Sequence, residues 1–76
     1  MIHLSKEDYF IMKGKVIEKY KGGSFGVELD QTGQIITCHL SGKIRKNNIK
    51  ILLYDKVDVE ISVYDLTQGR IVYRYR

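Results

Sequence analysis

The sequence predicts an all-β protein, built as a small closed barrel of five strands. Valine, isoleucine, tyrosine and threonine dominate its apolar segments, several of which alternate with polar residues at a period of two, as strands with one buried face do. Helical spacing is nowhere sustained. Five short strands in 76 residues favour closure, because an open sheet of this size leaves unprotected edges.

The first predicted strand places four residues on one face: Phe10, Met12, Gly14 and Val16. Apolar Ile17 then breaks the alternation, which predicts a bulge or bend near Gly14. Such a bend allows one strand to serve both halves of a barrel.

Two more strands follow in a hairpin. Glycine-rich residues 21–24 predict a flexible turn, and residues 25–29 alternate more clearly than any other segment. Residues 30–33 predict a short loop in which Gly33 takes the positive φ that the turn needs. The third strand is expected over residues 34–40.

The C-terminal half contains a basic connection and two further strands. Residues 56–63 alternate as a fourth strand, residues 64–69 read as a loop, and the last strand is expected over residues 70–76. Three strands, a short helical or irregular connection and two more strands match the five-stranded Greek-key OB-fold barrel. Nucleic acid bound to that fold lies across strands two and three and over the loops that join strands one to two and four to five.

Positive charge is concentrated in two segments. Residues 39–50, HLSGKIRKNNIK, hold four cations and no acid, and residues 67–76, TQGRIVYRYR, hold three arginines and no acid. Together they carry +7 in a chain whose net charge is +4, whereas residues 51–66 are mainly acidic. This segregation predicts a positive face, for which a phosphate backbone is the commonest partner. The alternative is a solvated surface of lysine and arginine.

Length and composition limit the function classes. Seventy-six residues form one domain, too small for a catalytic cleft between lobes, so a binding module is favoured over an enzyme. The single cysteine, Cys38, allows no internal disulfide and no pair of metal ligands; we expect no metal, no cofactor and a reducing compartment. Because no apolar run suits a signal peptide or a membrane span, we expect a soluble, cytoplasmic protein without membrane partners. Residues 1–8 are expected to form a flexible tail.

Several motifs together carry a family resemblance. HLSGKIRKN at residues 39–47, IKILLYDKVDVE at residues 49–60 and YDLTQGRIVYR at residues 64–74 resemble translation initiation factor one of the bacterial type, from bacteria or plastids. KEDYFIMKGKVIE and FGVELDQTGQ extend the resemblance over nearly the whole chain.

The resemblance implies one S1-like OB-fold RNA-binding domain over residues 1–76, and a monomer. It further implies binding to the decoding (A) site of the small ribosomal subunit, in contact with rRNA and a neighbouring ribosomal protein, where the factor blocks premature entry of tRNA and cooperates with the other two initiation factors. The location is then the cytoplasm, or the plastid stroma if the protein is plastid-encoded. Two other functions stay open: a cold-shock-like chaperone of single-stranded RNA, and a small barrel that binds proteins.

Eight residues are the candidate RNA contacts: His39, Lys43, Arg45, Lys46, Asn47, Lys50, Arg70 and Arg74. Three of the cations, Lys43, Arg45 and Lys46, follow Gly42 in a connection that must leave the sheet. There they can contact phosphates on both sides of the connection. Arg70 and Arg74 are expected on one face of the last strand, where their planar forks can bind phosphate or stack on a base. The alternative for Arg70 is a salt bridge to Asp65 or Glu60.

Some residues depart from the family pattern or have a competing interpretation. Asn48 stands where the family commonly has an aromatic residue, so base stacking is lost there, and Lys50 and Gln68 replace residues that are often arginine or basic. Tyr54 stands where glycine is usual, which predicts backbone strain or a shifted turn. We expect Tyr73 and Tyr75 to cap the core, because they share the parity of Ile71; the alternative for both rings is stacking on RNA bases. A catalytic pair of Cys38 and His39 is disfavoured, because neighbours on a strand point to opposite faces.

Overall fold

The computed structural model describes residues 8–75. The predicted tail of residues 1–8 therefore lies outside the described residues, except for Asp8, whose carbonyl accepts a hydrogen bond from Val63 N–H. The elements are β1 (Tyr9–Lys19), β2 (Phe25–Leu29), β3 (Ile35–Leu40), α1 (Gly42–Lys46), β4 (Lys56–Ser62) and β5 (Asp65–Arg74).

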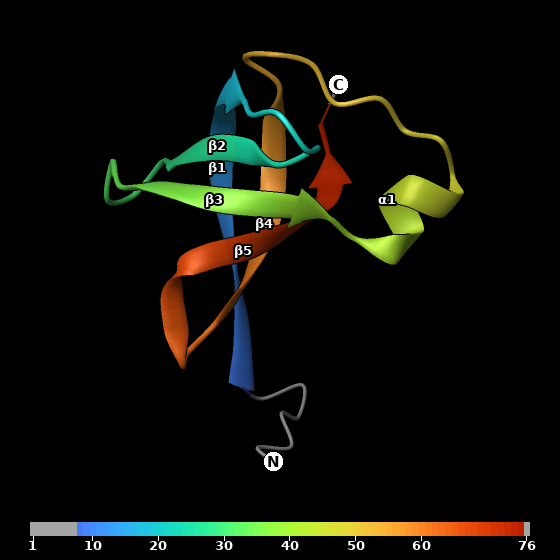
Figure 1. The fold of residues 1–76 in the computed structure, drawn as a ribbon. Coiled ribbons are helices and arrows are strands. Elements are labelled where there is room, and N and C mark those ends of the chain that lie inside the picture. Colours follow the sequence, from blue (N-terminus) through green and yellow to red (C-terminus); the bar gives the residue numbers. More distant parts are fainter. Residues whose placement is uncertain (1–7, 76) are drawn as a thin grey trace.

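The five strands close into a barrel in the order β1-β2-β3-β5-β4, and Figure 1 shows α1 beyond the end of β3, with a long connection passing from it to β4. β3 and β5 pair in parallel, and every other neighbouring pair is antiparallel. The predicted all-β OB-fold barrel, with a short helix between the third and fourth strands, is confirmed.

β1 joins the two halves of this barrel. Its first part pairs with β4 and its second part with β2, and Gly14 pairs with both, opposite Val57 and Leu29. A β-carbon on Gly14 would lie 2.6 Å from Val27 Cγ1 and 2.8 Å from Glu28 O, so only glycine allows the strands to approach this closely. The bulge itself lies between Val16 and Glu18, at Ile17, the residue that breaks the alternation in the sequence.

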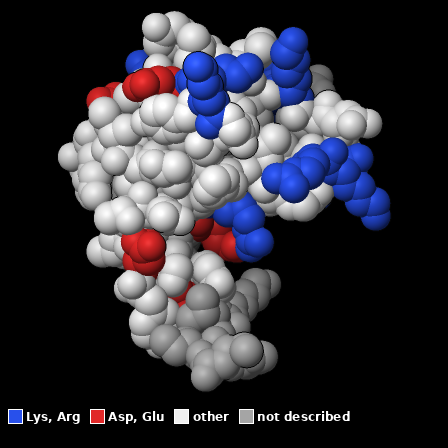
Figure 2. All heavy atoms as spheres, in the orientation of Figure 1, with Lys and Arg blue, Asp and Glu red and all other residues white. Residues whose placement is uncertain are grey.

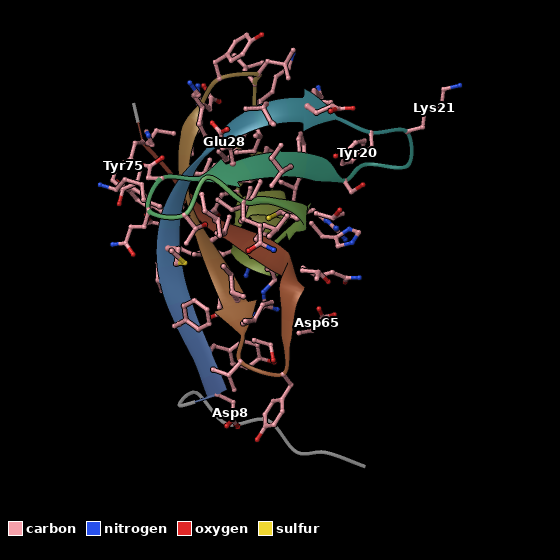
Figure 3. All side chains as sticks on the ribbon, turned by 90° about the vertical axis from the view of Figure 1, so that its left-hand side faces the viewer. Asp8, Tyr20, Lys21, Glu28, Asp65 and Tyr75 are labelled. Carbon is pink, nitrogen blue, oxygen red and sulfur yellow. The ribbon has the colours of Figure 1, made fainter. Side chains whose placement is uncertain are left out.

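The two hairpin turns of the N-terminal half contain the glycines that the sequence predicts. Gly22, Gly23 and Gly33 all have positive φ, which glycine adopts without a steric penalty. Figure 3 shows the β1–β2 turn projecting from the barrel with Tyr20 and Lys21.

The core fills the barrel and includes one residue of the helix. Its fully buried members are mostly aliphatic: Val16, Val27, Ile36, Cys38, Ile44, Val57, Val59, Ile61 and Ile71. Ile44 comes from α1, and Ile51 from the connection is also buried, so the connection is fastened to the barrel at two points.

The last hairpin differs from the prediction. β5 begins at Asp65, so the predicted loop over residues 64–69 is mostly strand, and the turn is Val63–Tyr64. Glycine and aspartate disfavour strands, but pairing overrides that preference: Gly69 pairs with both β3 and β4, and Asp65 pairs with β4. Gly69 fits because its missing side chain leaves room for Ile36 Cδ1, which a β-carbon would meet at 3.1 Å.

A second bulge lies in β5. Ile71 pairs with Val59 and Tyr73 with Asp58, so Val72 is the extra residue and the inward and outward positions exchange beyond it. The prediction that Tyr73 caps the core is therefore wrong: its side chain is 54% exposed. Tyr75 is half-buried, and its hydroxyl hydrogen-bonds to Asp58, which raises the pKa of Tyr75.

Candidate nucleic-acid interface

The short helix α1 has defined ends. Ser41 caps its start, since its Oγ accepts a hydrogen bond of 3.2 Å from Ile44 N–H. At its end, Ile49 N–H donates to Ile44 O at 3.1 Å and Asn48 N–H donates to Arg45 O at 3.2 Å, the pattern of a Schellman motif. These contacts, with buried Ile44 as anchor, fix one helical turn at the end of the barrel.

Asn48 is the residue on which this helix end depends. Its φ is +54°, a left-handed conformation that glycine and asparagine adopt more readily than other residues. The position that departs from the family pattern is thus also the C′ position of the Schellman motif.

Four exposed cations surround this helix: Lys43, Arg45, Lys46 and Lys50. Within residues 8–75 none of the four forms an ion pair, and the first turn of α1 contains no acid. Figure 2 shows Lys and Arg side chains gathered on the side of the molecule where α1 lies. This cationic surface is available to bind phosphates, since no carboxylate of residues 8–75 pairs with its four cations.

A groove of about 640 Å³ lies between the C-terminal end of α1 and the end of β5. Lys43, Lys50 and Arg74 bring positive charge to its walls, and Asn47 contributes an amide. Tyr73 adds an exposed ring that the second bulge turns outward. Such a set suits an RNA strand, because cations bind phosphates while rings stack on bases and amides hydrogen-bond to their edges.

Arg74 also supports the groove from within. Its Nε donates to Asp55 Oδ2 at 2.8 Å, and the same oxygen accepts Leu52 N–H at 2.8 Å. Both charged side chains are mostly buried, with 30% of Arg74 and 17% of Asp55 exposed. Arg74 therefore fastens the connection to β5, and its charge is partly neutralised.

The other predicted arginine lies on a different face. In the antiparallel pairing of β4 with β5, Arg70 lies opposite Glu60, whereas Arg74 lies opposite fully buried Val57. The prediction that the two arginines share a face is therefore wrong. The bulge between them is the reason. Arg70 forms an ion pair with Glu60, the alternative that its sequence context left open.

The predicted contacts thus form two groups. Lys43, Arg45, Lys46, Asn47, Lys50 and Arg74 lie around α1 and its groove, while His39 and Arg70 are neighbours in the parallel pairing of β3 with β5. His39 and Arg70 line a second, shallower depression together with Tyr9 and Tyr64. Sequence reasoning left base stacking by Tyr73 only as the alternative to a core position, because the bulge that exposes its ring leaves no signal in the sequence. Asn48 stood out in the sequence only for the ring that it lacks; its place at the end of the helix could have been found from its position just after a basic helix end.

Two other expectations concern reactive and metal-binding groups. Cys38 has no exposed surface, and burial raises the pKa of its thiol to about 12, so the thiolate that nucleophilic chemistry needs does not form near neutral pH. Among the described residues, no three His, Cys, Asp or Glu side chains lie close enough together to hold a metal ion. Nor does any helix in this part of the chain have the length and apolar character to cross a membrane.

Comparison with known proteins identifies the family. No protein-family model matches the sequence. The solution structure of translation initiation factor one from the Wolbachia endosymbiont strain TRS of Brugia malayi is similar over 92% of this chain and 82% of that one, with 38% sequence identity and a TM-score of 0.77. The chain belongs to the family of translation initiation factor one. The resemblance noted in the sequence is thereby confirmed.

Two larger proteins share the barrel. YjeQ from Thermotoga maritima matches with 28% identity and a TM-score of 0.74, and YloQ, a circularly permuted GTPase, with 22% identity and a TM-score of 0.73. This chain corresponds to only 23% and 25% of their respective lengths, although the matches take in 88% and 97% of its own residues. The similarity to YloQ shows the fold alone.

Proposed function

We propose that the protein binds the decoding (A) site of the small ribosomal subunit through its cationic surface and assists initiation-complex assembly together with the other two initiation factors. It acts as a monomer and without enzymatic activity, contacting rRNA and a neighbouring ribosomal protein. Family membership supports the general role. The observation that carries the RNA contact is the set of four exposed cations around α1, none of which forms an ion pair within the described part of the chain.

The fixed position of α1 suits a role in which its cations hold the protein in place on rRNA phosphates. Lys43, Arg45 and Lys46 extend from one fastened helical turn, so they can bind phosphates without first ordering a flexible loop. Arg45 can take a phosphate oxygen pair in its planar fork, whereas the lysines act as point charges. A folded body of 34 × 29 × 24 Å held in place by these contacts excludes tRNA by its volume.

The alternative of a cold-shock-like RNA chaperone lacks its stacking surface. That function needs exposed aromatic residues on the second and third strands. Phe25 is the single aromatic residue of β2 and β3, and it is only 6% exposed.

Titration of the fluorescently labelled protein with purified small subunits, and separately with unstructured single-stranded RNA, tests the proposal. We expect saturable one-to-one binding to the subunit and much weaker binding to the free RNA. Replacement of Lys43, Arg45 and Lys46 by alanine should weaken subunit binding by about 3–5 kcal/mol, since charged hydrogen bonds contribute about 1.5–3 kcal/mol each and seldom add fully.

The matched control replaces three exposed lysines of β1 and so changes the net charge equally: Lys13, Lys15 and Lys19. It should reduce binding far less. Equal losses in the two triple variants would mean that net charge, and not the cationic surface around α1, drives binding. Equal affinity of the unsubstituted protein for subunit and free RNA would favour the chaperone.

A further inference from the structure

The ion pair between Arg74 and Asp55 uses one edge of the arginine side chain. Arg74 Nε donates to Asp55 Oδ2 at 2.8 Å, and within residues 8–75 this is the only hydrogen bond of the guanidinium. A guanidinium has five N–H donors, so the four on its two Nη nitrogens stay available within this part of the chain. Arg74 also lines the groove beside α1. One edge of the guanidinium is thus held, and the Nη edge can meet a ligand.

The carboxylate of Asp55 is itself fixed in place. Asp55 O accepts Val16 N–H at 2.9 Å, and Asp55 Oδ2 also accepts Leu52 N–H at 2.8 Å. The preceding residue, Tyr54, donates its N–H to Val16 O at 2.6 Å and has a φ of +71°, the backbone strain that a residue in place of glycine predicts there. Such strain persists because the surroundings impose the conformation. Asp55 is therefore a rigid partner that restricts the long side chain of Arg74.

The groove offers Arg74 a phosphate to bind. Lys43 and Lys50 line the same groove, and neither forms an ion pair with a described residue. A phosphate held there meets the lysines on one wall and the Nη edge of Arg74 on the other. Two parallel N–H bonds fix the orientation of a phosphate, whereas a lysine acts as a point charge. Because a side chain that is already ordered loses less entropy on binding, the held arginine is the better orienting group.

We propose that Asp55 is a positioning residue for RNA binding: it holds the Arg74 guanidinium by Nε so that the Nη edge faces the groove and takes one phosphate bidentately. This inference rests on the proposed function, because it describes how one cation of the groove meets rRNA. Charge alone predicts the opposite role, in which an acid beside the groove repels RNA and weakens its binding. The two accounts therefore differ in the sign of one substitution.

Asp55→Asn is that substitution, since it removes the charge and keeps an oxygen that can accept Leu52 N–H. A neutral amide holds a guanidinium less firmly than a carboxylate does. Asp55→Asn should therefore weaken binding to small subunits about fivefold, although it makes the net charge more positive. Asp30→Asn is the matched control, because it changes the net charge equally in an ion pair with Lys56 that does not line the groove. It should not weaken binding.

A double-mutant cycle separates positioning from a purely structural role of Asp55. In the Arg74→Ala background no guanidinium remains to be positioned, so Asp55→Asn should change the affinity by less than about twofold. Arg74→Lys is a second test that leaves Asp55 and the net charge intact. Its ammonium can pair with Asp55 but has no second edge for the phosphate, so it should bind within about twofold of Arg74→Ala.

Three results would overturn the inference. Unchanged or tighter binding of Asp55→Asn would show that Asp55 does not assist RNA binding. An equal loss from Asp55→Asn in the Arg74→Ala background would assign Asp55 to the fold of the connection alone. Binding of Arg74→Lys as tight as that of the unsubstituted protein would show that the groove needs only a charge, and this comparison decides if Asp55→Asn does not fold. Failure of the unsubstituted protein to bind subunits would instead reject the proposed function.

Discussion

At the scale of single residues, Asn48 shows how an exposed side chain can matter to the fold through its backbone. The residue lines the groove and has a φ of +54°. Its exposure alone suggests that any side chain is tolerated there. The left-handed backbone conformation, however, costs conformational free energy for most residues other than glycine and asparagine.

Asn48→Tyr should therefore have two effects of opposite sign. A ring in the groove that stacks on a base should tighten subunit binding by about 1–3 kcal/mol. The left-handed backbone should lower stability by about 0.5–1 kcal/mol, or several degrees in melting temperature. Anisotropy titration and thermal unfolding measure the two quantities on the same sample.

Asn48→Gly is the matched control, because glycine keeps the left-handed backbone and adds no ring. It should leave both the melting temperature and the affinity close to those of the unsubstituted chain. If Asn48→Tyr leaves affinity unchanged, the groove does not offer a base to this position.

Cys38 provides a pH signature of the folded core. Burial raises the pKa of its thiol from 9.0 to about 12, so between these values the folded chain keeps a proton that the unfolded chain releases. The free energy of unfolding should then fall as the pH rises above about 9, by up to about 1.4 kcal/mol per pH unit from this group.

Denaturant unfolding between pH 7 and 10.5, compared with Cys38→Ala, isolates this contribution. The alanine variant should be less stable at neutral pH, because a small cavity remains, and its profile should be flatter above pH 9. Parallel profiles would show that the thiol titrates normally in the folded chain.

At the scale of elements, the close approach of β1 and β2 at Gly14 should be intolerant of a side chain. Gly14→Ala places a β-carbon 2.6 Å from Val27 Cγ1 and should destabilise the barrel by about 1–3 kcal/mol. Chemical denaturation measures the loss.

Gly42→Ala is the control at this scale. A β-carbon on Gly42 meets nothing within 4 Å, and the residue begins α1. Alanine there should leave stability unchanged or raise it by up to about 1 kcal/mol, because it favours the helix and restricts the unfolded chain. Equal losses in the two variants would exclude the steric explanation for Gly14.

The elements also show where sequence reasoning succeeds and where it cannot. Alternation over residues 25–29 and 56–62 predicts β2 and β4 because one face of each is buried. The predicted start of β5 was wrong because Asp65 and Gly69 suggest a loop, whereas pairing of Asp65 with β4, and of Gly69 with both β3 and β4, imposes a strand. The predicted parity of Arg74 was wrong because a bulge depends on tertiary pairing, which local pattern does not encode.

The candidate RNA-binding surface also has one property that the sequence predicts and one that it does not. Clustering of cations along residues 43–50 is a property of the sequence, so the main candidate surface could be found from it. Ion pairing cannot be found from the sequence. The structure alone shows that Glu60 and Asp55 bind Arg70 and Arg74, whereas the cations around α1 form no ion pair with any described residue.

At the scale of the whole molecule, charge is segregated so that one side of the barrel attracts phosphate. The chain carries a net charge of +4. The ion pairs within residues 8–75 neutralise cations of β4 and β5 and involve none of the four cations around α1. The central claim is that these free cations, Lys43, Arg45, Lys46 and Lys50, are the main rRNA contacts.

The salt dependence of subunit binding tests this claim most directly. With about four phosphate contacts, a plot of log K against log salt concentration should have a slope near −3 to −4, because each neutralised phosphate releases condensed counterions. The triple alanine variant of Lys43, Arg45 and Lys46 should flatten the slope by about 2–3, and the β1 triple variant should leave it unchanged. A slope near zero, or the same slope in all three proteins, would contradict the account.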